Sequence, residues 1–380
     1  MKSKLLAVFL LLPLFAVAQT YTYSTLVSFP PQSKKGPATP NGYLTIDSKG
    51  NLYGAAGGGT RGQYGDGTIF KATPKGVLTV LHNFGGSDGL GPQGAVVFDK
   101  AGNLYGTTQE GGAHNWGTVY KLTPKNVETV LYSFRDTPED GNYPVYPVTL
   151  DSSGNVFGYT YYTVQDQPSS GAIYRVTPEG SFSIVYTFGQ NQGYDGFNPV
   201  GSMITDSEGN FYGTASQGGD FDACGLASGV VFKMTPDYDY TVLHTFCPNT
   251  GDVASPRGKL TQDNEGNMYG GGGGIFKITQ TGDESVINNC CFNPPFTPQP
   301  LVRDSAGNLY GVVSSNSTTT NSYVVKIGTD GAETVLYTSV MPVNIGEGLV
   351  LDSAGNIYGT TFNGGANGTG SIFKLTKRAN

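Results

Sequence analysis

The hydrophobic positions of the chain fall into short runs separated by glycine-containing turns. Residues 92–134 are the clearest stretch, with the runs PQGAVVFD, NLYGTT, GTVYKLT and VETVLYSF. Each run is rich in aromatic and β-branched residues and is short for a helix, so each predicts a β-strand. The segments KAGN and PKN between them predict tight turns, because Gly and Asn tolerate left-handed backbone and Pro pre-sets a turn.

This unit of four strands, which we name A to D in chain order, recurs along the chain. The pattern Asp-x-x-Gly-Asn-Φ-(Tyr/Phe)-Gly, which lies between strands A and B, occurs seven times, about 50 residues apart. The copies begin at Asp47, Asp99, Asp151, Asp206, Asp263, Asp304 and Asp352. Four short antiparallel strands per repeat are typical of a propeller blade, so the sequence predicts an all-β, seven-bladed β-propeller.

The two ends of the chain predict how the ring closes. The last repeat stops at GSIFKLTKRAN, after strand C, and has no strand D. The segment YTYSTLVSFP near the N-terminus has the pattern of a strand D without a preceding unit. We therefore expect the N-terminal strand to complete the last blade, which removes exposed sheet edges. The alternative, an open solenoid, would need capping repeats.

The first residues have the features of a secretory signal. Lys2 and Lys4 precede the apolar run LLAVFLLLPLFAVA, and small residues come directly before Gln19. This pattern predicts a signal peptide over residues 1–18 and one propeller domain over residues 19–380. We expect a secreted protein, extracellular or periplasmic, without membrane insertion, since no second long apolar run follows.

The charge of the chain argues against polyanionic partners. The formal net charge is −7, and 13% of the residues are charged. Such an acidic, weakly charged protein is a poor candidate for binding nucleic acid or an anionic membrane. A monomer is expected.

The repeat resembles a known family. The motif GNLYGTT…GG…GTVYKLTP…ETVLYSF is similar to the Gloeo/Verruco (GloVer) tandem repeat over essentially all of residues 19–380. The resemblance implies a bacterial, exported propeller of the choice-of-anchor class, whose members differ in their C-terminal sorting tails. The chain departs from that class in ending with KLTKRAN. The resemblance implies no substrate and no catalytic residue.

The loops between strands B and C and those between strand D and the next strand A share one face of a propeller, here called the loop face. Their length varies, whereas the A–B turns are nearly constant, so we expect ligands to bind at the loop face. Aromatic rings beside amide and carboxylate groups suit sugars or peptides, with ordinary loop packing as the alternative. The candidates are His114, Asn115, Trp116, Tyr143, Tyr161, Tyr162, Gln165, Asp166, Asp220, Phe221 and Asp222, with Arg257 and Glu347 predicted near the central channel.

Two repeated sets of charged residues have structural interpretations. A basic residue recurs in strand C, at Lys71, Lys121, Arg175, Lys233, Lys277, Lys326 and Lys374. With the repeated Asp, it predicts a ring of ion pairs. In four D–A loops an Asp precedes a Pro: Asp88, Asp140, Asp195 and Asp252. One carboxylate per loop is too few for Ca²⁺, so turn capping is favoured.

The sequence provides few groups for catalysis or for a metal. His82 and His244 occupy a strand-D position that holds Tyr in VLYSF, so they are interpreted as structural. The positions predicted to approach the channel carry one carboxylate, Glu347. We therefore expect no metal site and no cofactor, and catalytic residues stay unassigned.

The four cysteines fit an oxidising compartment. Cys224 lies in the B–C loop of the fourth repeat and Cys247 ends its strand D, so both belong to the loop face. This placement predicts a Cys224–Cys247 disulfide. The adjacent Cys290 and Cys291 form either a vicinal disulfide or two thiols, and all three pairings stay formally open.

Five consecutive glycines, Gly270–Gly274, follow the strand B of the fifth repeat. A phosphate-binding loop would need a Lys and a helix after them. Alignment with the other repeats instead predicts a shortened B–C hairpin, which would leave a notch in the loop face.

These features favour a binding or scaffold protein that recognises an extracellular polysaccharide or a surface protein. Two alternatives stay open: an extracellular hydrolase or lyase of the propeller type, and a structural component of the cell envelope.

Overall fold

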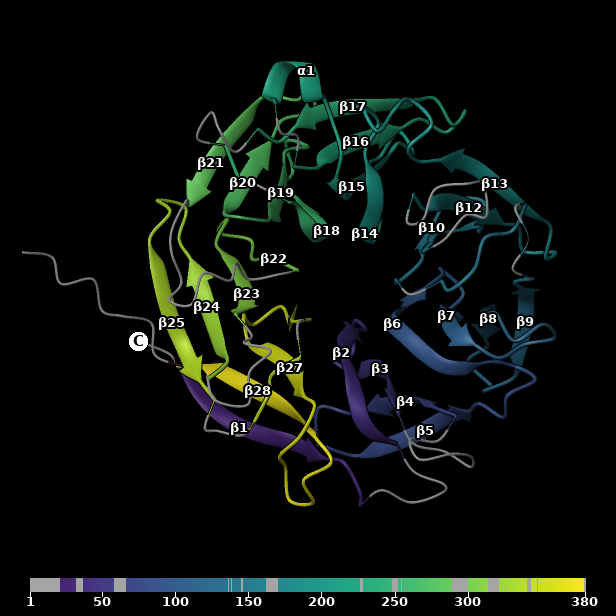
Figure 1. Ribbon diagram of the computed structural model, residues 1–380. Coiled ribbons are helices and arrows are strands. Elements are labelled where there is room, and N and C mark those ends of the chain that lie inside the picture. Colours follow the sequence, from purple (N-terminus) through teal and green to yellow (C-terminus); the bar gives the residue numbers. More distant parts are fainter. Residues whose placement is uncertain are drawn as a thin grey trace, which may run out of the picture.

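The computed structural model is a seven-bladed β-propeller, with seven four-stranded antiparallel sheets arranged as blades around a central axis (Figure 1). The structure describes residues 21–31, 37–57, 66–135, 137, 139–144, 146–161, 170–225, 228–247, 252–253, 255–288, 300–313, 321–339, 343–346 and 348–378. The predicted signal peptide, residues 1–18, lies outside these ranges.

Each blade uses its strands in the order A to D, with A next to the axis and D at the rim (Figure 1). Blade 1 consists of β2 (Ala38–Ile46), β3 (Leu52–Gly57), β4 (Thr68–Ala72) and β5 (Leu78–Asn83). Blade 2 consists of β6 (Leu90–Phe98), β7 (Leu104–Glu110), β8 (Thr118–Leu122) and β9 (Glu128–Ser133). Blade 3 consists of β10 (Thr149–Leu150), β11 (Val156–Thr160), β12 (Ala172–Val176) and β13 (Phe182–Thr187). Blade 4 consists of β14 (Phe197–Thr205), β15 (Phe211–Gln217), β16 (Val230–Met234) and β17 (Tyr240–Thr245). Blade 5 consists of β18 (Arg257–Gln262), β19 (Met268–Gly271), β20 (Ile275–Ile278) and β21 (Glu284–Asn288). Blade 6 consists of β22 (Val302–Arg303), β23 (Leu309–Val313), β24 (Tyr323–Ile327) and β25 (Glu333–Thr338). Blade 7 is β26 (Val350–Leu351), β27 (Ile357–Thr361), β28 (Ser371–Lys377) and β1 (Tyr21–Ser28).

The N-terminal strand closes the ring, as predicted. Strand β1 pairs antiparallel with β28, so that Tyr21 faces Lys377 and Ser28 faces Ser371. The first and last described strands therefore lie side by side in one blade (Figure 1). The described residues contain one short helix, α1 (Phe221–Cys224), in the B–C loop of blade 4. No helix in this part of the chain is long and apolar enough to cross a bilayer.

At five junctions, neighbouring blades pack through a stack of three residues. In blade 2, Gly106 of strand B lies under the ring of Tyr120 in strand C, so close that an added Cβ would collide with the ring. Phe84, which follows strand D of blade 1, packs edge-on against Tyr120 with ring centroids 5.1 Å apart. Both aromatic side chains are almost fully buried. The equivalent ring pairs at other junctions are Phe29–Phe70, Phe134–Tyr174, Phe188–Phe232 and Phe246–Phe276.

The repeated Asp caps the turn between strands A and B. Asp99 Oδ1 accepts hydrogen bonds from the backbone N–H groups of Ala101 and Asn103, both at 2.9 Å. Its Oδ2 accepts from Asn103 Nδ2 at 2.6 Å and from the Tyr105 hydroxyl at 3.2 Å. Burial opposes ionisation, but the hydrogen bonds from Asn103, Tyr105 and Ala101 outweigh it and hold the pKa of Asp99 below its usual value.

The predicted ring of Asp–Lys ion pairs is wrong. Within the described ranges, no ion pair joins a repeated Asp to a strand-C Lys. Lys121 instead lies opposite Tyr105 in the sheet, with Nζ 5.7 Å from the centre of its ring. The ring therefore makes a cation–π contact with Lys121 while its hydroxyl donates to Asp99. The same contact joins Lys71 to Tyr53, Lys233 to Tyr212 and Lys374 to Tyr358.

The five glycines form a tight hairpin, as predicted. Strands β19 and β20 pair directly, with Gly271 opposite Ile275. The Gly272 N–H donates to the Gly274 carbonyl at 2.8 Å. Gly270 lies under Phe276 and is the strand-B glycine of the stack in blade 5. Residues 289–299 and 314–320, which would border the expected notch, lie outside the described residues, so the notch stays a prediction.

The first test concerns the seam between blades 7 and 1. We expect Phe29→Ala to lower the free energy of unfolding by about 3–5 kcal/mol, because it empties a fully buried site at the closing junction. Chemical denaturation measures the change. Phe362→Ala is the control, since Phe362 is 37% exposed. Equal effects of the two substitutions would contradict the stacking role.

The second test concerns the Asp-capped turn. Asp99→Ala removes the acceptor of four hydrogen bonds. The buried side-chain amide of Asn103 thereby loses the carboxylate to which it donates. We expect the free energy of unfolding to fall by about 2–3 kcal/mol. Lys100→Ala, an exposed neighbour in the same turn, should change it by less than about 0.5 kcal/mol.

The lowered pKa of Asp99 also predicts the pH dependence of stability. A carboxyl group whose pKa is lower in the folded state than in the unfolded state stabilises the folded protein. This stabilisation is fully present above the unfolded pKa, near 3.8, and it is lost as the pH falls through the folded pKa. The same direction holds for Asp47, Asp206, Asp263, Asp304 and Asp352. We expect the urea midpoint to fall on acidification below about pH 4. The decline should be shallower in Asp99→Ala, and an identical acid profile would contradict this.

Candidate functional site

The loops of the loop face are hydrogen-bonded to one another. In blade 2, the Gly112 N–H of the B–C loop donates to the Gly86 carbonyl of the preceding D–A loop at 2.8 Å. Blade 4 repeats the bond, from Gly219 to Gly193, also at 2.8 Å. In these two blades, the D–A loop is thus held by the B–C loop of the blade that it enters. This arrangement places side chains on a rigid scaffold, which suits ligand binding.

The structure brings together candidates from blades 2 and 3. Trp116 is half-buried and packs edge-to-face on Tyr143, with ring centroids 5.1 Å apart. His114 and Asn115, just before Trp116, are exposed. The backbone N–H of Tyr161 donates to the carbonyl of the residue before Tyr143, at 3.1 Å. Tyr161 is 38% exposed. We call these five residues the aromatic patch.

A second group lies on blade 4. Asp220 caps α1, and its Oδ1 accepts from the Ala223 N–H at 2.9 Å. The exposed Asp222 accepts a hydrogen bond from the Tyr194 hydroxyl at 2.6 Å, and this bond raises the pKa of Tyr194. The rings of Tyr194 and Phe221 lie edge-on, 6.0 Å apart. Tyr194 comes from the D–A loop before blade 4 and was not among the sequence candidates.

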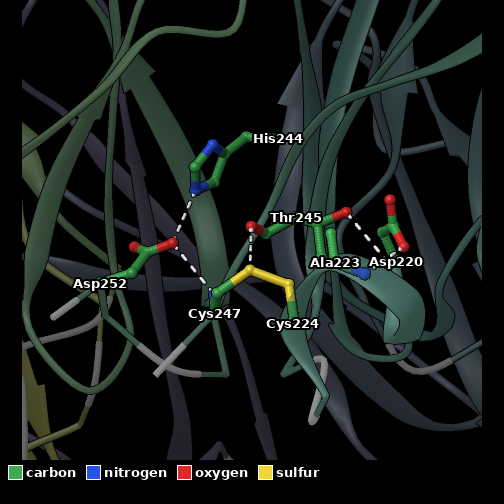
Figure 2. Close-up of a disulfide and its surroundings, with 7 residues drawn as sticks. All are labelled: Asp220, Ala223, Cys224, His244, Thr245, Cys247 and Asp252. Carbon is green, nitrogen blue, oxygen red and sulfur yellow. Dashed lines mark hydrogen bonds and ion pairs between the residues drawn. A yellow bond between two sulfur atoms is a disulfide. The ribbon is translucent and has the colours of Figure 1, made fainter. Parts of the chain in front are cut away.

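A disulfide joins Cys224, at the end of α1, to Cys247, just after strand D of the same blade (Figure 2). The backbone N–H of Asp220 also donates to Thr245 Oγ1 at 3.3 Å (Figure 2). The B–C loop of blade 4 is thus attached to the rim by one covalent bond and one hydrogen bond. This is the pairing that the sequence predicts.

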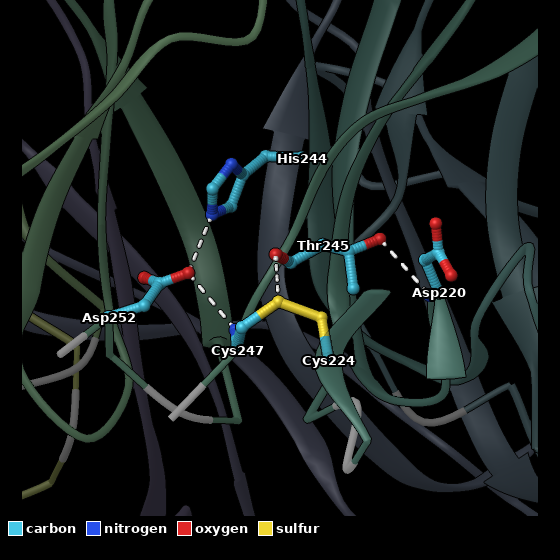
Figure 3. Close-up of polar contacts among 6 residues, drawn as sticks. All are labelled: Asp220, Cys224, His244, Thr245, Cys247 and Asp252. Atoms are coloured by element: carbon cyan, nitrogen blue, oxygen red, sulfur yellow. Dashed lines mark hydrogen bonds and ion pairs between the residues drawn. A yellow bond between two sulfur atoms is a disulfide. The ribbon is translucent and has the colours of Figure 1, made fainter. Parts of the chain in front are cut away.

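The Asp residues of the D–A loops cap their loops and accept a hydrogen bond from strand D. In blades 2 and 3 the donors are Tyr132, to Asp140 at 2.6 Å, and Tyr186, to Asp195 at 2.7 Å. In blades 1 and 4 a histidine takes the place of this tyrosine: His82 Nε2 lies 2.9 Å from Asp88 Oδ2, and His244 Nε2 lies 2.9 Å from Asp252 Oδ2 (Figure 3). The Gly85 and Cys247 N–H groups donate to the same carboxylates as Nε2.

These two histidines are less isolated than the sequence indicates. His82 and Asp88 lie beside Glu128, and His244 and Asp252 lie beside Glu284. In each cluster the ligand atoms are within 4.8 Å of one another. The sequence did not predict such a set, because the glutamate belongs to strand D of the next blade. The His in the strand-D slot that otherwise holds Tyr was the one signal in the sequence.

The other candidates are not brought to either group by a contact in the described residues. Arg257 is exposed at the start of β18, opposite Gly271 of β19. Tyr162, Gln165, Asp166, Glu347, Cys290 and Cys291 lie outside the described residues.

The chain belongs to the Gloeobacter/Verrucomicrobia repeat family, whose model matches residues 60–271. A comparison with the curated proteins found no match. Among solved structures, the chain is similar to a streptogramin B lyase, with a TM-score of 0.63, 13% identity, and coverage of 94% of this chain and 98% of the other. It is also similar to the extracellular domain assigned to the hybrid two component system BT3049 from B. thetaiotaomicron, with a TM-score of 0.58, 15% identity, and coverage of 94% and 41%. These similarities show the fold and assign no reaction to this chain.

The disulfide provides the third test. We expect the double substitution Cys224→Ser and Cys247→Ser to lower the free energy of unfolding by roughly 3 kcal/mol, because the bond closes a loop with a sequence separation of 23. Urea unfolding without reductant measures the loss. Adding reductant should bring the unsubstituted protein to the level of the double variant, without affecting that variant. A variant that still responds to reductant would place the stabilising bond at other cysteines.

Proposed function

We propose that this protein acts outside the cytoplasm as a binding or scaffold propeller that recognises an extracellular polysaccharide or a surface protein through its loop face. The observation that carries the proposal is the aromatic patch. There the Trp116–Tyr143 pair lies beside the exposed His114 and Asn115, with Tyr161 close to it.

The chemistry of the aromatic patch suits sugar rings. A pyranose ring has an apolar face that packs on indole or phenol rings, and its hydroxyl groups bond to amide and imidazole groups. The half-buried Trp116 packs against the core cluster of blades 2 and 3, so its ring is held in place before a ligand arrives. A held ring loses little conformational entropy on binding.

Four further observations support export and a binding role. The N-terminal pattern is that of a signal peptide, and a disulfide is present on the loop face. Two structures of similar fold are extracellular domains, which supports the location by analogy of fold alone. The acidic character of the chain favours a neutral or basic ligand over a polyanion.

The fourth test is a glycan array and a pull-down from cell-surface extracts with the protein lacking residues 1–18. Trp116→Ala should reduce binding at least tenfold, since truncating a central aromatic side chain costs about 2 kcal/mol or more. Because Trp116 also packs on the core, Tyr161→Ser is a second variant at an exposed position. It should weaken binding and change stability less than Trp116→Ala does.

Val127→Ala is the matched control for this test. Val127 is 57% exposed and follows the C–D turn, on the face opposite the loops. Binding that survives both Trp116→Ala and Tyr161→Ser would contradict the proposed surface. Binding lost equally in the control would point to general destabilisation.

A further inference from the structure

The rim of the propeller has a recurring contact between neighbouring D strands. A side chain near the end of one strand D faces a side chain at the start of the next strand D. At three junctions the two are aromatic and stacked: Tyr132–Phe182 at 4.2 Å, Tyr186–Tyr240 at 3.9 Å and Tyr337–Tyr23 at 4.3 Å between ring centroids. The seven junctions of one chain thus form an internal comparison of the same backbone position.

At two junctions this contact changes in both partners. Where blade 1 meets blade 2, His82 replaces the first aromatic residue and Glu128 the second. Where blade 4 meets blade 5, His244 and Glu284 make the same replacement. A histidine ring could stack on an aromatic residue as tyrosine does. Instead, both histidines face a glutamate, and the D–A loop adds an aspartate to each pair.

The carboxylates of these clusters are crowded and incompletely bonded. The Asp252 side chain is only 8% exposed, and its Oδ1 has no hydrogen-bond partner in the described structure. Glu284 Oε1 and Glu128 Oε1 are likewise buried without a partner. In each cluster the ligand atoms of the two carboxylates and the histidine lie within 4.8 Å of one another. Two carboxylates held this closely are stabilised by a cation or by a shared proton.

We propose that His82, Asp88 and Glu128, and equally His244, Asp252 and Glu284, form two binding sites for a divalent transition-metal ion of the Zn²⁺ type. One imidazole nitrogen and two carboxylate oxygens are a donor set that suits such ions. Ca²⁺ and Mg²⁺ prefer oxygen ligands alone, so the histidine selects against them. Three protein donors leave a further coordination position for water or an external ligand.

Bound ions would connect parts of the molecule that are far apart in sequence. Each ion would join strand D of one blade, the D–A loop, and strand D of the next blade. At the junction of blades 4 and 5, the Cys247 N–H donates to Asp252 Oδ2 at 3.0 Å, next to the Cys224–Cys247 disulfide (Figure 3). The metal and the disulfide would therefore fix the same loop, beside the second group of candidate residues.

The test is a titration of Zn²⁺ into the protein lacking residues 1–18. The protein carries no polyhistidine tag and is first treated with EDTA and dialysed. Isothermal titration calorimetry should show two equivalents of Zn²⁺ bound, and Co²⁺ should produce a visible absorption band of matching stoichiometry. Glu128→Gln and Glu284→Gln should each weaken one site at least about 100-fold, because the loss of a ligand exceeds the effect of an outer-shell change.

Two double variants test the sites without disrupting the fold, because their substitutions copy blade junctions that already exist in this chain. His82→Tyr with Glu128→Phe reproduces the junction of blades 2 and 3. His244→Tyr with Glu284→Tyr reproduces that of blades 3 and 4. Each should remove one equivalent of metal, and their combination should remove both.

Glu333→Gln is the matched control. Glu333 starts β25, at the position equivalent to Glu128 and Glu284. The preceding strand D, however, has Asn288 where the two clusters have a histidine. This variant should retain both equivalents. Absence of Zn²⁺ binding by the unsubstituted protein would overturn the proposal and leave the clusters as proton-sharing contacts. Two equivalents retained by the combined variant would overturn it as well.

Discussion

The packing between neighbouring blades depends at five junctions on one contact, in which the tip of an aromatic ring of strand C approaches a glycine of strand B. The absence of a side chain at Gly106 lets the Tyr120 ring approach the backbone of its own blade. The other edge of that ring is then available to Phe84 of the preceding blade. A β-carbon at the glycine would push the ring outward into the space that the neighbouring blade occupies.

The rim shows how one backbone supports different chemistry. The facing positions of neighbouring D strands hold stacked aromatic pairs at three junctions and His–Asp–Glu clusters at two. In both clusters the histidine and the glutamate come from different repeats, so each cluster is formed across a blade junction and not within one repeat. The repeat therefore specifies the scaffold, while departures from it within a single chain identify positions with a separate role.

Features that rest on local or repeated interactions could be predicted from the sequence. The turn signals, the strand patterns and the missing strand D of the last repeat were enough for the propeller and its closure by β1. The placement of Cys224 and Cys247 on one face of one blade was enough for their pairing. The predicted ion pairs failed because Lys121 and Asp99 contact opposite parts of the same side chain. The Tyr105 ring faces the lysine and its hydroxyl faces the aspartate.

The repeat of turns and strands can be predicted from the amino-acid sequence, because each turn and each hairpin is formed by residues that are neighbours along the chain. The number of blades, their strand order and the shortened glycine hairpin could therefore be read from the chain alone. Contacts between blades follow a different rule. Phe84 on Tyr120, Trp116 on Tyr143, and His244 beside Glu284 involve residues whose distance depends on how one twisted sheet rotates against the next. That rotation is set by side-chain packing across the junction, so these sites become visible only when the ring is assembled.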